Sequence, residues 1–282
     1  MPTSSRHTPC TGRSCSALNE LTRLVGADPR RWLLAFDFDG TLSPIVANPE
    51  DAVLDPELAP LLECLRELSI PVVLFSGRPL AFLRERAPGL LAVGSYGLEL
   101  PPAEGSDTIS HPEGFDAAAA REALTAAEAA LPGVAGAWPG AVVEIKDWGV
   151  SIHLRKADPP IPAEAVRAAL APFLSDGRLE LVPGRLVWEL RPAAGVDKGW
   201  AIRELAQRFD PSAVVYAGDD VGDAPAFAAV RELGERMPAL AIGVNSGEAR
   251  PEAFINCDVV LEGRQQLADV LRELVSLAEA AA

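Results

Sequence analysis

Residues 32–42 read WLLAFDFDGTL, and this stretch decides the fold. Its first five residues are apolar without interruption, which is typical of a strand that is buried on both faces. Similar runs stand at 71–75 (PVVLF) and at 213–217 (AVVYA). Because parallel sheets covered by helices on both faces are built from such strands, the three runs predict an α/β protein.

Helical patterns and weaker apolar runs continue this alternation along the chain. Apolar residues that recur with the period of an α-helix predict helices at about 57–68, 79–87, 197–208, 223–233 and 264–280. Weaker strands are expected at 91–94, 240–244 and 259–261. The regular exchange of strand and helix predicts a doubly wound, Rossmann-like core with a parallel sheet.

The middle of the chain interrupts this rhythm. It predicts a helix at 116–131, two strands, a helix at 162–174 and two further strands. The four strands alternate between polar and apolar residues. Such alternation is typical of a sheet with one exposed face, so an inserted α+β cap domain is expected. The expected organisation is a flexible leader at 1–28, a core domain at 29–106 and 193–282, and the cap domain at 107–192.

The charge balance and the cysteines restrict the partners. The chain of 282 residues contains 40 acidic and 25 basic residues, which gives a formal net charge of −15. Nucleic acid would be repelled, and no segment approaches the ~18 consecutive apolar residues of a membrane helix, so neither partner is expected. The four cysteines form no CxxC pair, which argues against a zinc site and favours a reducing cytoplasm. Cys64 lies in an apolar helical pattern and is expected in the core. The oligomeric state does not follow from the sequence.

Side chains with reactive chemistry follow the three predicted strands. Asp37 and Asp39 follow the first, Ser76-Gly77-Arg78 the second, and Asp219, Asp220 and Asp223 the third, while Lys198 opens a later helix. In an open α/β sheet, ligands bind beyond the carboxyl ends of the strands. Each motif taken singly is as well explained by a helix cap or a turn. Together the carboxylates would repel one another unless a hard cation lay among them, which predicts a Mg²⁺ site.

The motifs DFDGTL (37–42), SGR (76–78), Lys198-Gly199 and GDDVGD (218–223) resemble those of haloacid-dehalogenase-like phosphatases. This resemblance implies that Asp37 attacks phosphorus and binds Mg²⁺. It implies that Asp39 is the general acid and base, and that its backbone carbonyl reaches the metal. It further implies Asp219 as a metal ligand, with Asp220 beside it as a ligand or a partner of a ligand. It implies Ser76, Gly77, Lys198 and the amides of Gly40 and Thr41 as phosphate contacts. Arg78 either binds the substrate or pairs with a carboxylate.

This division of labour agrees with the chemistry of phosphate esters. A carboxylate nucleophile divides one difficult step into two easier ones. Asp37 cannot be both nucleophile and proton donor, so a second carboxyl group nearby is required, and Asp39 answers that need. Mg²⁺ and Lys198 would supply the positive charge that an acidic protein otherwise lacks.

The strands of the insert present a polar face. Alternation places Val143, Ile145, Val150, Ile152, Leu154, Leu186, Trp188 and Leu190 on one face, and Glu144, Lys146, Ser151, His153, Arg155, Glu189 and Arg191 on the other. The first face is expected to pack on the two insert helices. The second is either a solvated charged surface or a surface that reads the substrate.

The segments Glu144-x-Lys146, His153-x-Arg155 and Glu189-Leu190-Arg191-Pro192 are similar to the trehalose-6-phosphate phosphatase family. This resemblance implies hydrolysis of trehalose 6-phosphate, with substrate contacts from Arg78, Glu144, Lys146, His153, Arg155 and Glu189. Another capped sugar phosphatase, for sucrose phosphate or mannosylglycerate phosphate, and a silent regulatory module are the alternatives. The family often has His where Tyr96 stands, and Thr and Glu where Gly222 and Ala224 stand. Asp223 is therefore expected to support the metal site or to cap a helix.

Overall fold

The computed structural model describes residues 19–24, 26–46, 48–102, 108–184, 186–247 and 251–281. The chain forms two compact units. The core unit contains the residues up to Gly97 together with Asp197–Ala282, and the insert unit contains Leu98–Val196. The first division follows Gly97, where it was expected after residue 106, a position outside the described residues. The second division follows Val196, where it was expected after Pro192.

The core unit is built on a six-stranded sheet in the order β10-β9-β8-β1-β2-β3. Every adjacent pair of these strands is parallel. The strands are β1 (Trp32–Asp37), β2 (Val72–Phe75), β3 (Leu91–Val93), β8 (Ala213–Gly218), β9 (Ala239–Val244) and β10 (Val259–Leu261). All residues of β1, β2 and β8 are buried, as their apolar runs predict. The doubly wound parallel core is confirmed.

The strand order reverses beside β1. Successive strands β1, β2 and β3 run outward in one direction, whereas β8, β9 and β10 run outward in the other. In open α/β sheets such a reversal opens a crevice at the carboxyl ends of the two strands that flank it. The register pairs Asp37 with Phe75 and Phe36 with Ala217, so the segments that follow β1, β2 and β8 begin side by side.

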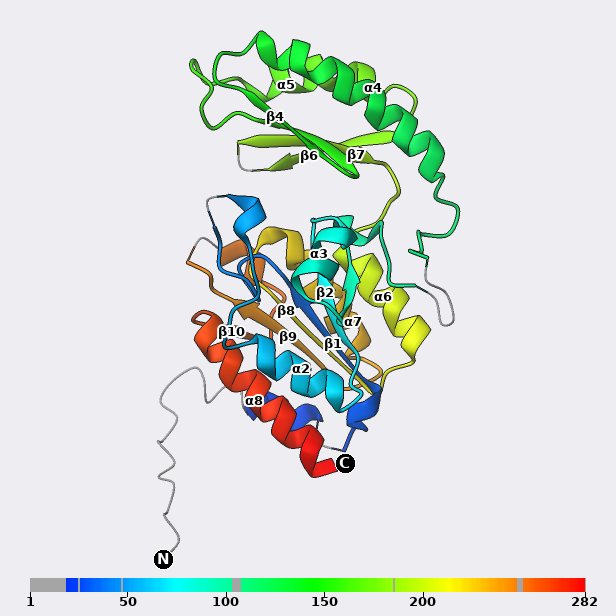
Figure 1. Cartoon of the computed structure of the whole chain (residues 1–282), viewed down its shortest axis with the longest axis vertical. Helices are drawn as coiled ribbons and strands as arrows, with labels where there is room; N and C mark the ends of the chain where they lie inside the picture. Colours follow the sequence, from blue (N-terminus) through cyan, green and yellow to red (C-terminus); the bar gives the residue numbers. More distant parts are fainter. Residues whose placement is uncertain are drawn as a thin grey trace, which may run out of the picture. The chain divides into compact units, whose positions relative to one another are not determined.

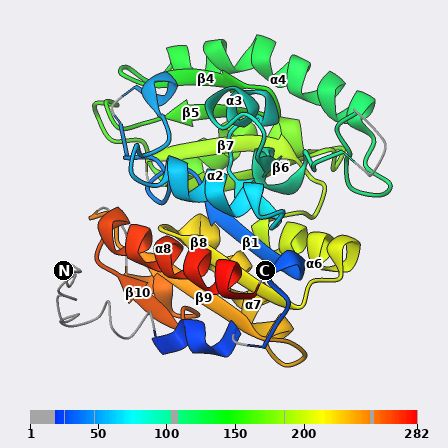
Figure 2. The ribbon, with the colours of Figure 1, turned by 60° about the horizontal axis from the view of Figure 1, so that its bottom comes forward.

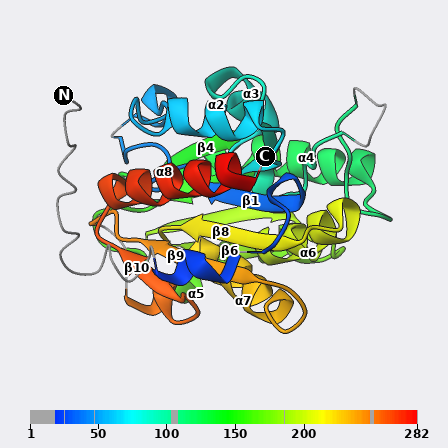
Figure 3. The same ribbon diagram turned by 90° about the horizontal axis from the view of Figure 1, so that it is seen from below.

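Helices cover both faces of this sheet. α2 (Ala59–Glu67) and α8 (Arg264–Ala281) lie on one face, and α6 (Lys198–Phe209) and α7 (Ala224–Leu233) on the other (Figure 3). Figure 2 shows α8 in front of the sheet, running along the strands. α8 buries Leu267, Leu271 and Leu274, a spacing that presents one helical stripe to the sheet. A shorter helix, α3 (Leu80–Arg86), follows β2.

One expectation for the core unit is wrong. Cys64, on α2, is exposed, because the buried stripe of this helix runs through Leu62 and Leu65. In the described part of the expected leader, the 3₁₀ helix η1 (Leu21–Leu24) buries both of its leucines. Residues 1–18 lie outside the described residues.

The insert unit is a four-stranded antiparallel sheet with helices on one face (Figure 1). Its strands β4 (Val142–Lys146), β5 (Gly149–His153), β6 (Leu179–Gly184) and β7 (Val187–Pro192) have the order β4-β5-β7-β6. Its helices are α4 (Ala117–Gly136) and α5 (Ala163–Leu170). Leu124 and Leu131 of α4 and Val166 of α5 share one core cluster with the sheet residues Ile152 and Leu190.

The alternation of the insert strands is confirmed with three exceptions. One is Ile145, which was expected on the face that packs on the helices and is 59% exposed on the edge strand β4. The register sets Glu144 opposite Ser151 and Ser151 opposite Glu189, so these polar residues occupy one face. Leu186 precedes β7 with a φ of 58° and is 52% exposed, so it does not share the apolar face. Arg155 lies in a turn beyond the end of β5 and is exposed, so strand alternation does not fix its direction.

No helix in the described part of the chain is long and apolar enough to cross a membrane.

Candidate active site

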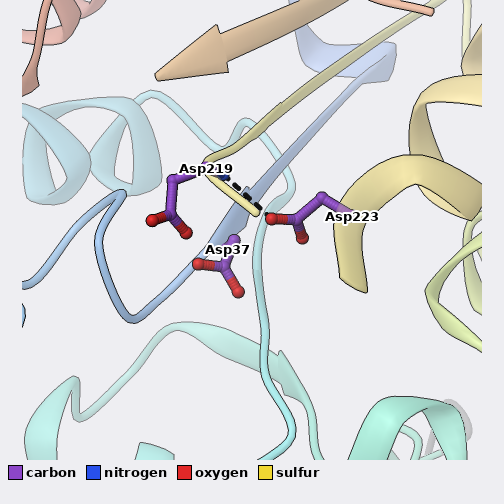
Figure 4. Close-up of side chains that lie close together, drawn as sticks. All are labelled: Asp37, Asp219 and Asp223. Atoms are coloured by element: carbon purple, nitrogen blue, oxygen red, sulfur yellow. Dashed lines mark hydrogen bonds between the residues drawn. The ribbon is translucent and has the colours of Figure 1, made fainter. Parts of the chain in front are cut away.

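Three buried carboxylates meet at the carboxyl ends of β1 and β8. Asp37 is the last residue of β1, Asp219 follows β8, and Asp223 ends the short turn that comes next. One carboxylate oxygen from each residue lies within 4.8 Å of the others (Figure 4). The sequence predicted that Asp37 and Asp219 lie close together at the strand ends, and the structure places both residues there.

Lys198 supplies a positive charge to the carboxylate cluster. It is the first residue of α6, whose amino end is capped by Asp197 through a bond from the Trp200 amide. Its Nζ donates to Asp37 Oδ1 and to Asp223 Oδ1, each at 2.6 Å. Lys198 is 4% exposed, so these ion pairs are shielded from water. Buried charge-assisted bonds of this kind fix the position of the ammonium group firmly.

Asp223 organises the cluster. Its Oδ1 accepts from Lys198 Nζ and from the Tyr216 hydroxyl, and its Oδ2 accepts from the amides of Asp219 and Asp220. A carboxylate offers about four acceptor positions, so these donors fill them. Asp223 therefore shapes the loop and holds Lys198, while Asp37 and Asp219 retain more capacity for a ligand.

Asp220 lies differently from what the motif suggests. Its carboxylate accepts from the Gly222 amide at 2.7 Å and caps the 3₁₀ helix η6 (Val221–Asp223). The clustered carboxylates are those of Asp37, Asp219 and Asp223, and neither Asp220 nor the side chain of Asp39 is among them. The turn 220–223 directs the buried Asp223 side chain back toward the end of β8, where it accepts from the Asp219 amide, and leaves Asp220 exposed.

Burial dominates the electrostatics of the cluster. It raises the pKa of Asp37 well above its usual range, although Lys198 acts in the opposite direction. It likewise raises the pKa of Asp219 to about 7, with a further contribution from the charge of Asp223. Burial by itself lowers the pKa of Lys198, but the attraction of Asp223 and Asp37 outweighs it and the pKa is raised. An additional cation would stabilise the ionised carboxylates.

The donor set fits Mg²⁺. The cluster offers carboxylate oxygens and contains neither histidine nor cysteine, and oxygen is the ligand that Mg²⁺ prefers. Oxygens that share a Mg²⁺ lie within about 4 Å of one another, close to the spacing found here. Asp37 and Asp219 are therefore suited to hold such an ion.

The loop after β1 is shaped by a close approach to Asp219. Gly40 has a φ of 87°, and a Cβ at this position would lie 2.1 Å from Asp219 Oδ2, so only glycine fits. The Gly40 amide donates to the Ser43 carbonyl at 2.8 Å, and its contact with phosphate stays a prediction. The hydroxyl of Thr41 is buried and has no hydrogen-bond partner among the described residues, and it remains a candidate for a ligand contact.

The loop after β2 carries the expected hydroxyl group. Ser76 is 2% exposed, and its hydroxyl accepts from the Arg78 amide at 3.1 Å. A Cβ on Gly77 would lie 2.3 Å from the ring of Tyr96, so the glycine makes room for that ring. Tyr96 itself has a left-handed backbone with a φ of 57°. The sequence did not indicate this contact between Gly77 and Tyr96.

Asp39 and Arg78 form a bidentate ion pair. Arg78 Nε donates to Asp39 Oδ2 and the second guanidinium nitrogen donates to Asp39 Oδ1, each at 2.7 Å. The guanidinium also donates to the Pro49 carbonyl and lies 4.4 Å from the ring centre of Phe82. Of the two interpretations of Arg78, the structure shows the pair with a carboxylate.

The polar face of the insert sheet contains a hydrogen-bonded network. Lys146 Nζ donates to Glu189 Oε1 at 3.0 Å, and His153 Nε2 lies 2.7 Å from Glu144 Oε2. Between these pairs stands Ser151, which is fully buried and whose hydroxyl has no partner among the described residues. The face thus presents both donors and acceptors in a fixed arrangement.

The parallel sheet with its strand-end aspartates and the inserted α+β unit define a haloacid-dehalogenase-like fold. A haloacid dehalogenase-like hydrolase from B. subtilis has the same fold, with a TM-score of 0.56 at 14% identity over 85% of this chain and 98% of that one. The C-terminal domain of trehalose-6-phosphate phosphatase from C. albicans gives a TM-score of 0.68 at 22% identity, over 97% of this chain and 99% of the other.

The family model of trehalose-phosphatase matches residues 35–259, and the chain belongs to this family. The trehalose-phosphate phosphatase of Mycobacterium tuberculosis (strain H37Rv) is 36% identical over 269 residues, which is 91% of this chain. The protein of the same name from Mycobacterium marinum is 39% identical over 76% of this chain. The matched regions span 66% and 55% of the lengths of these two relatives.

Proposed function

We propose that this protein is a trehalose-phosphatase that hydrolyses trehalose 6-phosphate to trehalose and phosphate in trehalose biosynthesis. The observation that carries the proposal is the buried cluster in which Lys198 bridges Asp37 and Asp223 beside Asp219. Membership of the trehalose-phosphatase family supports the choice of substrate. A cytoplasmic location is proposed with it, supported by the free thiols of Cys64 and Cys257.

Asp37 is the nucleophile in this proposal. Its carboxylate attacks phosphorus, a bond forms between the Asp37 oxygen and phosphorus, and the bond between phosphorus and the sugar oxygen breaks. Asp39 gives a proton to the departing sugar oxygen. In the second half, Asp39 takes a proton from a water molecule, which attacks the aspartyl phosphate and releases inorganic phosphate with Asp37 regenerated.

The phosphoryl group needs positive charge and hydrogen-bond donors around its oxygens. Lys198 supplies a buried ammonium group next to Asp37, and the hydroxyl groups of Ser76 and Thr41 are buried near the same strand ends. A Mg²⁺ held by Asp37, Asp219 and the backbone carbonyl of Asp39 would neutralise charge on the transferring group. Such preorganised charge is expected to contribute most of the acceleration.

The polar face of the insert sheet binds the sugar in this proposal. Glu144, Lys146, His153 and Glu189 already hold one another in defined positions, so a sugar hydroxyl would meet oriented donors and acceptors. Sites built to bond a hydroxyl group reject ligands that lack it by large factors. A solvated charged face would show no such selectivity, which separates the two interpretations.

A panel of phosphosugars tests the proposal. Purified protein is assayed for phosphate release from trehalose 6-phosphate, sucrose 6-phosphate, mannosylglycerate phosphate and glucose 6-phosphate, with Mg²⁺ or with EDTA. Trehalose 6-phosphate should give the highest kcat/KM, and EDTA or Asp37→Asn should abolish release. Preference for another sugar would reassign the substrate, and no release from any of them would support a regulatory module.

A further inference from the structure

Tyr216 is a buried tyrosine whose position nothing in the proposed chemistry explains. It lies in the middle of β8, opposite Ala35 of β1, and is 0% exposed. Its ring packs edge-on against Phe75 and Phe227, with ring centres 5.6 Å apart in each case. A phenylalanine would satisfy this packing equally well, so the hydroxyl group has a separate purpose.

The hydroxyl of Tyr216 joins the charged cluster. It donates to Asp223 Oδ1 at 2.6 Å, the same oxygen that accepts from Lys198 Nζ at 2.6 Å. Lys198 donates in turn to Asp37 Oδ1. Hydrogen bonds therefore connect the Tyr216 hydroxyl to the proposed nucleophile Asp37 through Asp223 and Lys198.

Competition between two carboxylates makes this hydroxyl important. Lys198 is shared by Asp37 and Asp223, and its flexible side chain moves toward whichever carboxylate attracts it more strongly. The Tyr216 hydroxyl partly neutralises Asp223 Oδ1. Without it, the buried oxygen would lose one of its donors and would attract the ammonium group more strongly.

We propose that Tyr216 is a positioning residue that keeps the Lys198 ammonium group shared between Asp223 and Asp37. It touches neither substrate nor metal and acts through Asp223. The proposal rests on the proposed function, because Lys198 must meet the phosphoryl group on Asp37. Loss of the hydroxyl should weaken stabilisation of that group and leave recognition of the sugar unchanged.

Tyr216→Phe tests the proposal because it removes one oxygen atom and keeps the ring. We expect kcat for trehalose 6-phosphate to fall about tenfold, as for loss of a hydrogen bond to a buried charge, while KM changes little. The second readout is calorimetric binding of beryllofluoride, a mimic of the phosphoryl group, in the presence of Mg²⁺. Its affinity should fall by a similar factor, and binding of Mg²⁺ alone should be unaltered.

Phe227→Leu is the matched control, since it disturbs the same aromatic cluster and leaves the hydroxyl in place. It should lower Tm without changing kcat or beryllofluoride affinity. Unchanged kcat in Tyr216→Phe, or reduced kcat with unchanged beryllofluoride affinity, would overturn the positioning role. If the wild-type protein releases no phosphate from trehalose 6-phosphate but the beryllofluoride affinity still depends on the hydroxyl, the proposed function fails and the positioning role stands.

A second measurement does not require Tyr216 to be replaced. The chain contains two tyrosines, so 3-fluorotyrosine incorporated in a Tyr96→Phe background labels Tyr216 alone. Its fluorine resonance should shift when Lys198→Met removes the ammonium group that shares Asp223 Oδ1. An unchanged fluorine chemical shift in the Lys198→Met variant would contradict the coupling between the hydroxyl and Lys198.

Discussion

Arg78 donates hydrogen bonds to both carboxylate oxygens of Asp39, at 2.7 Å each. Asp39 stands two residues after Asp37 in the chain. The arginine is itself fixed by the Pro49 carbonyl and the Phe82 ring. These two bonds take two of the about four acceptor positions of the carboxylate, and the remaining lone pairs can meet a substrate proton. In the proposed reaction, Arg78 therefore fixes the orientation of Asp39 while Asp39 acts as acid and base.

Asp39→Asn tests this acid and base role. The asparagine keeps an oxygen for Arg78 but cannot transfer the proton, so turnover of trehalose 6-phosphate should fall by about 10²–10⁴. p-Nitrophenyl phosphate is the control substrate, because its leaving group needs no proton. The first half of its reaction should persist, and the phosphorylated protein should accumulate. Undiminished turnover of trehalose 6-phosphate would remove Asp39 from the mechanism.

Asp219→Asn should weaken binding of Mg²⁺. The substitution takes a negative charge from a site where Asp37 is the other available carboxylate, and the affinity measured by calorimetry should fall about tenfold or more. Asp220→Asn is the matched control, since that carboxylate caps η6 through the Gly222 amide and should leave the affinity nearly unchanged. Equal losses in the two variants would show that Asp220 also binds the ion.

Lys146→Met should impair recognition of the sugar. The substitution removes the ammonium group that donates to the Glu189 carboxylate on the polar face. We expect kcat/KM for trehalose 6-phosphate to fall about 10- to 100-fold, with p-nitrophenyl phosphate hydrolysis nearly unchanged. Glu128→Gln on α4 is a charge control away from the sheet face. Parallel losses for both substrates, or no loss at all, would favour the solvated surface.

The stability of the insert unit should depend on its own core cluster. Leu190 of β7 is fully buried in that cluster, whereas Ile145 of β4 is 59% exposed. Leu190→Ala should lower the free energy of unfolding by about 2–5 kcal/mol, and Ile145→Ala by about 0.5 kcal/mol or less. Denaturant unfolding monitored by tryptophan fluorescence measures both. Similar losses in the two variants would mean that the cluster is not the core of the insert.

The parts of the fold that the sequence predicted are those in which burial acts on many residues together. The runs of β1, β2 and β8 are apolar throughout, which identified them as buried strands and placed Asp37 and Asp219 at the same edge. Local backbone conformation was harder to predict. Leu186 leaves the apolar face because its φ is positive, and no property of leucine indicates that conformation.

Within the candidate site, residue types predicted the chemistry better than the partners of each side chain. The resemblance implied Asp220 as a ligand or a partner of a ligand, and Asp223 as a support of the metal site or a helix cap. The turn brings Asp223 into the cluster, while Asp220 caps η6. The Gly40 amide was expected to contact phosphate, and the sequence did not indicate its hydrogen bond to the Ser43 carbonyl. These outcomes depend on a few torsion angles in short loops, where no repeating pattern of polar and apolar residues exists to be read.

The central claim is that Asp37 carries the phosphoryl group. Asp39→Asn protein is mixed with Mg²⁺ and p-nitrophenyl phosphate, whose leaving group needs no proton, and is then quenched in acid, digested and examined by mass spectrometry. The account predicts one phosphoryl group on the peptide that contains Asp37, and none when Asp37→Asn is added to the variant. Phosphate release by the wild-type protein with no label on Asp37, or with the label on another side chain, would contradict it.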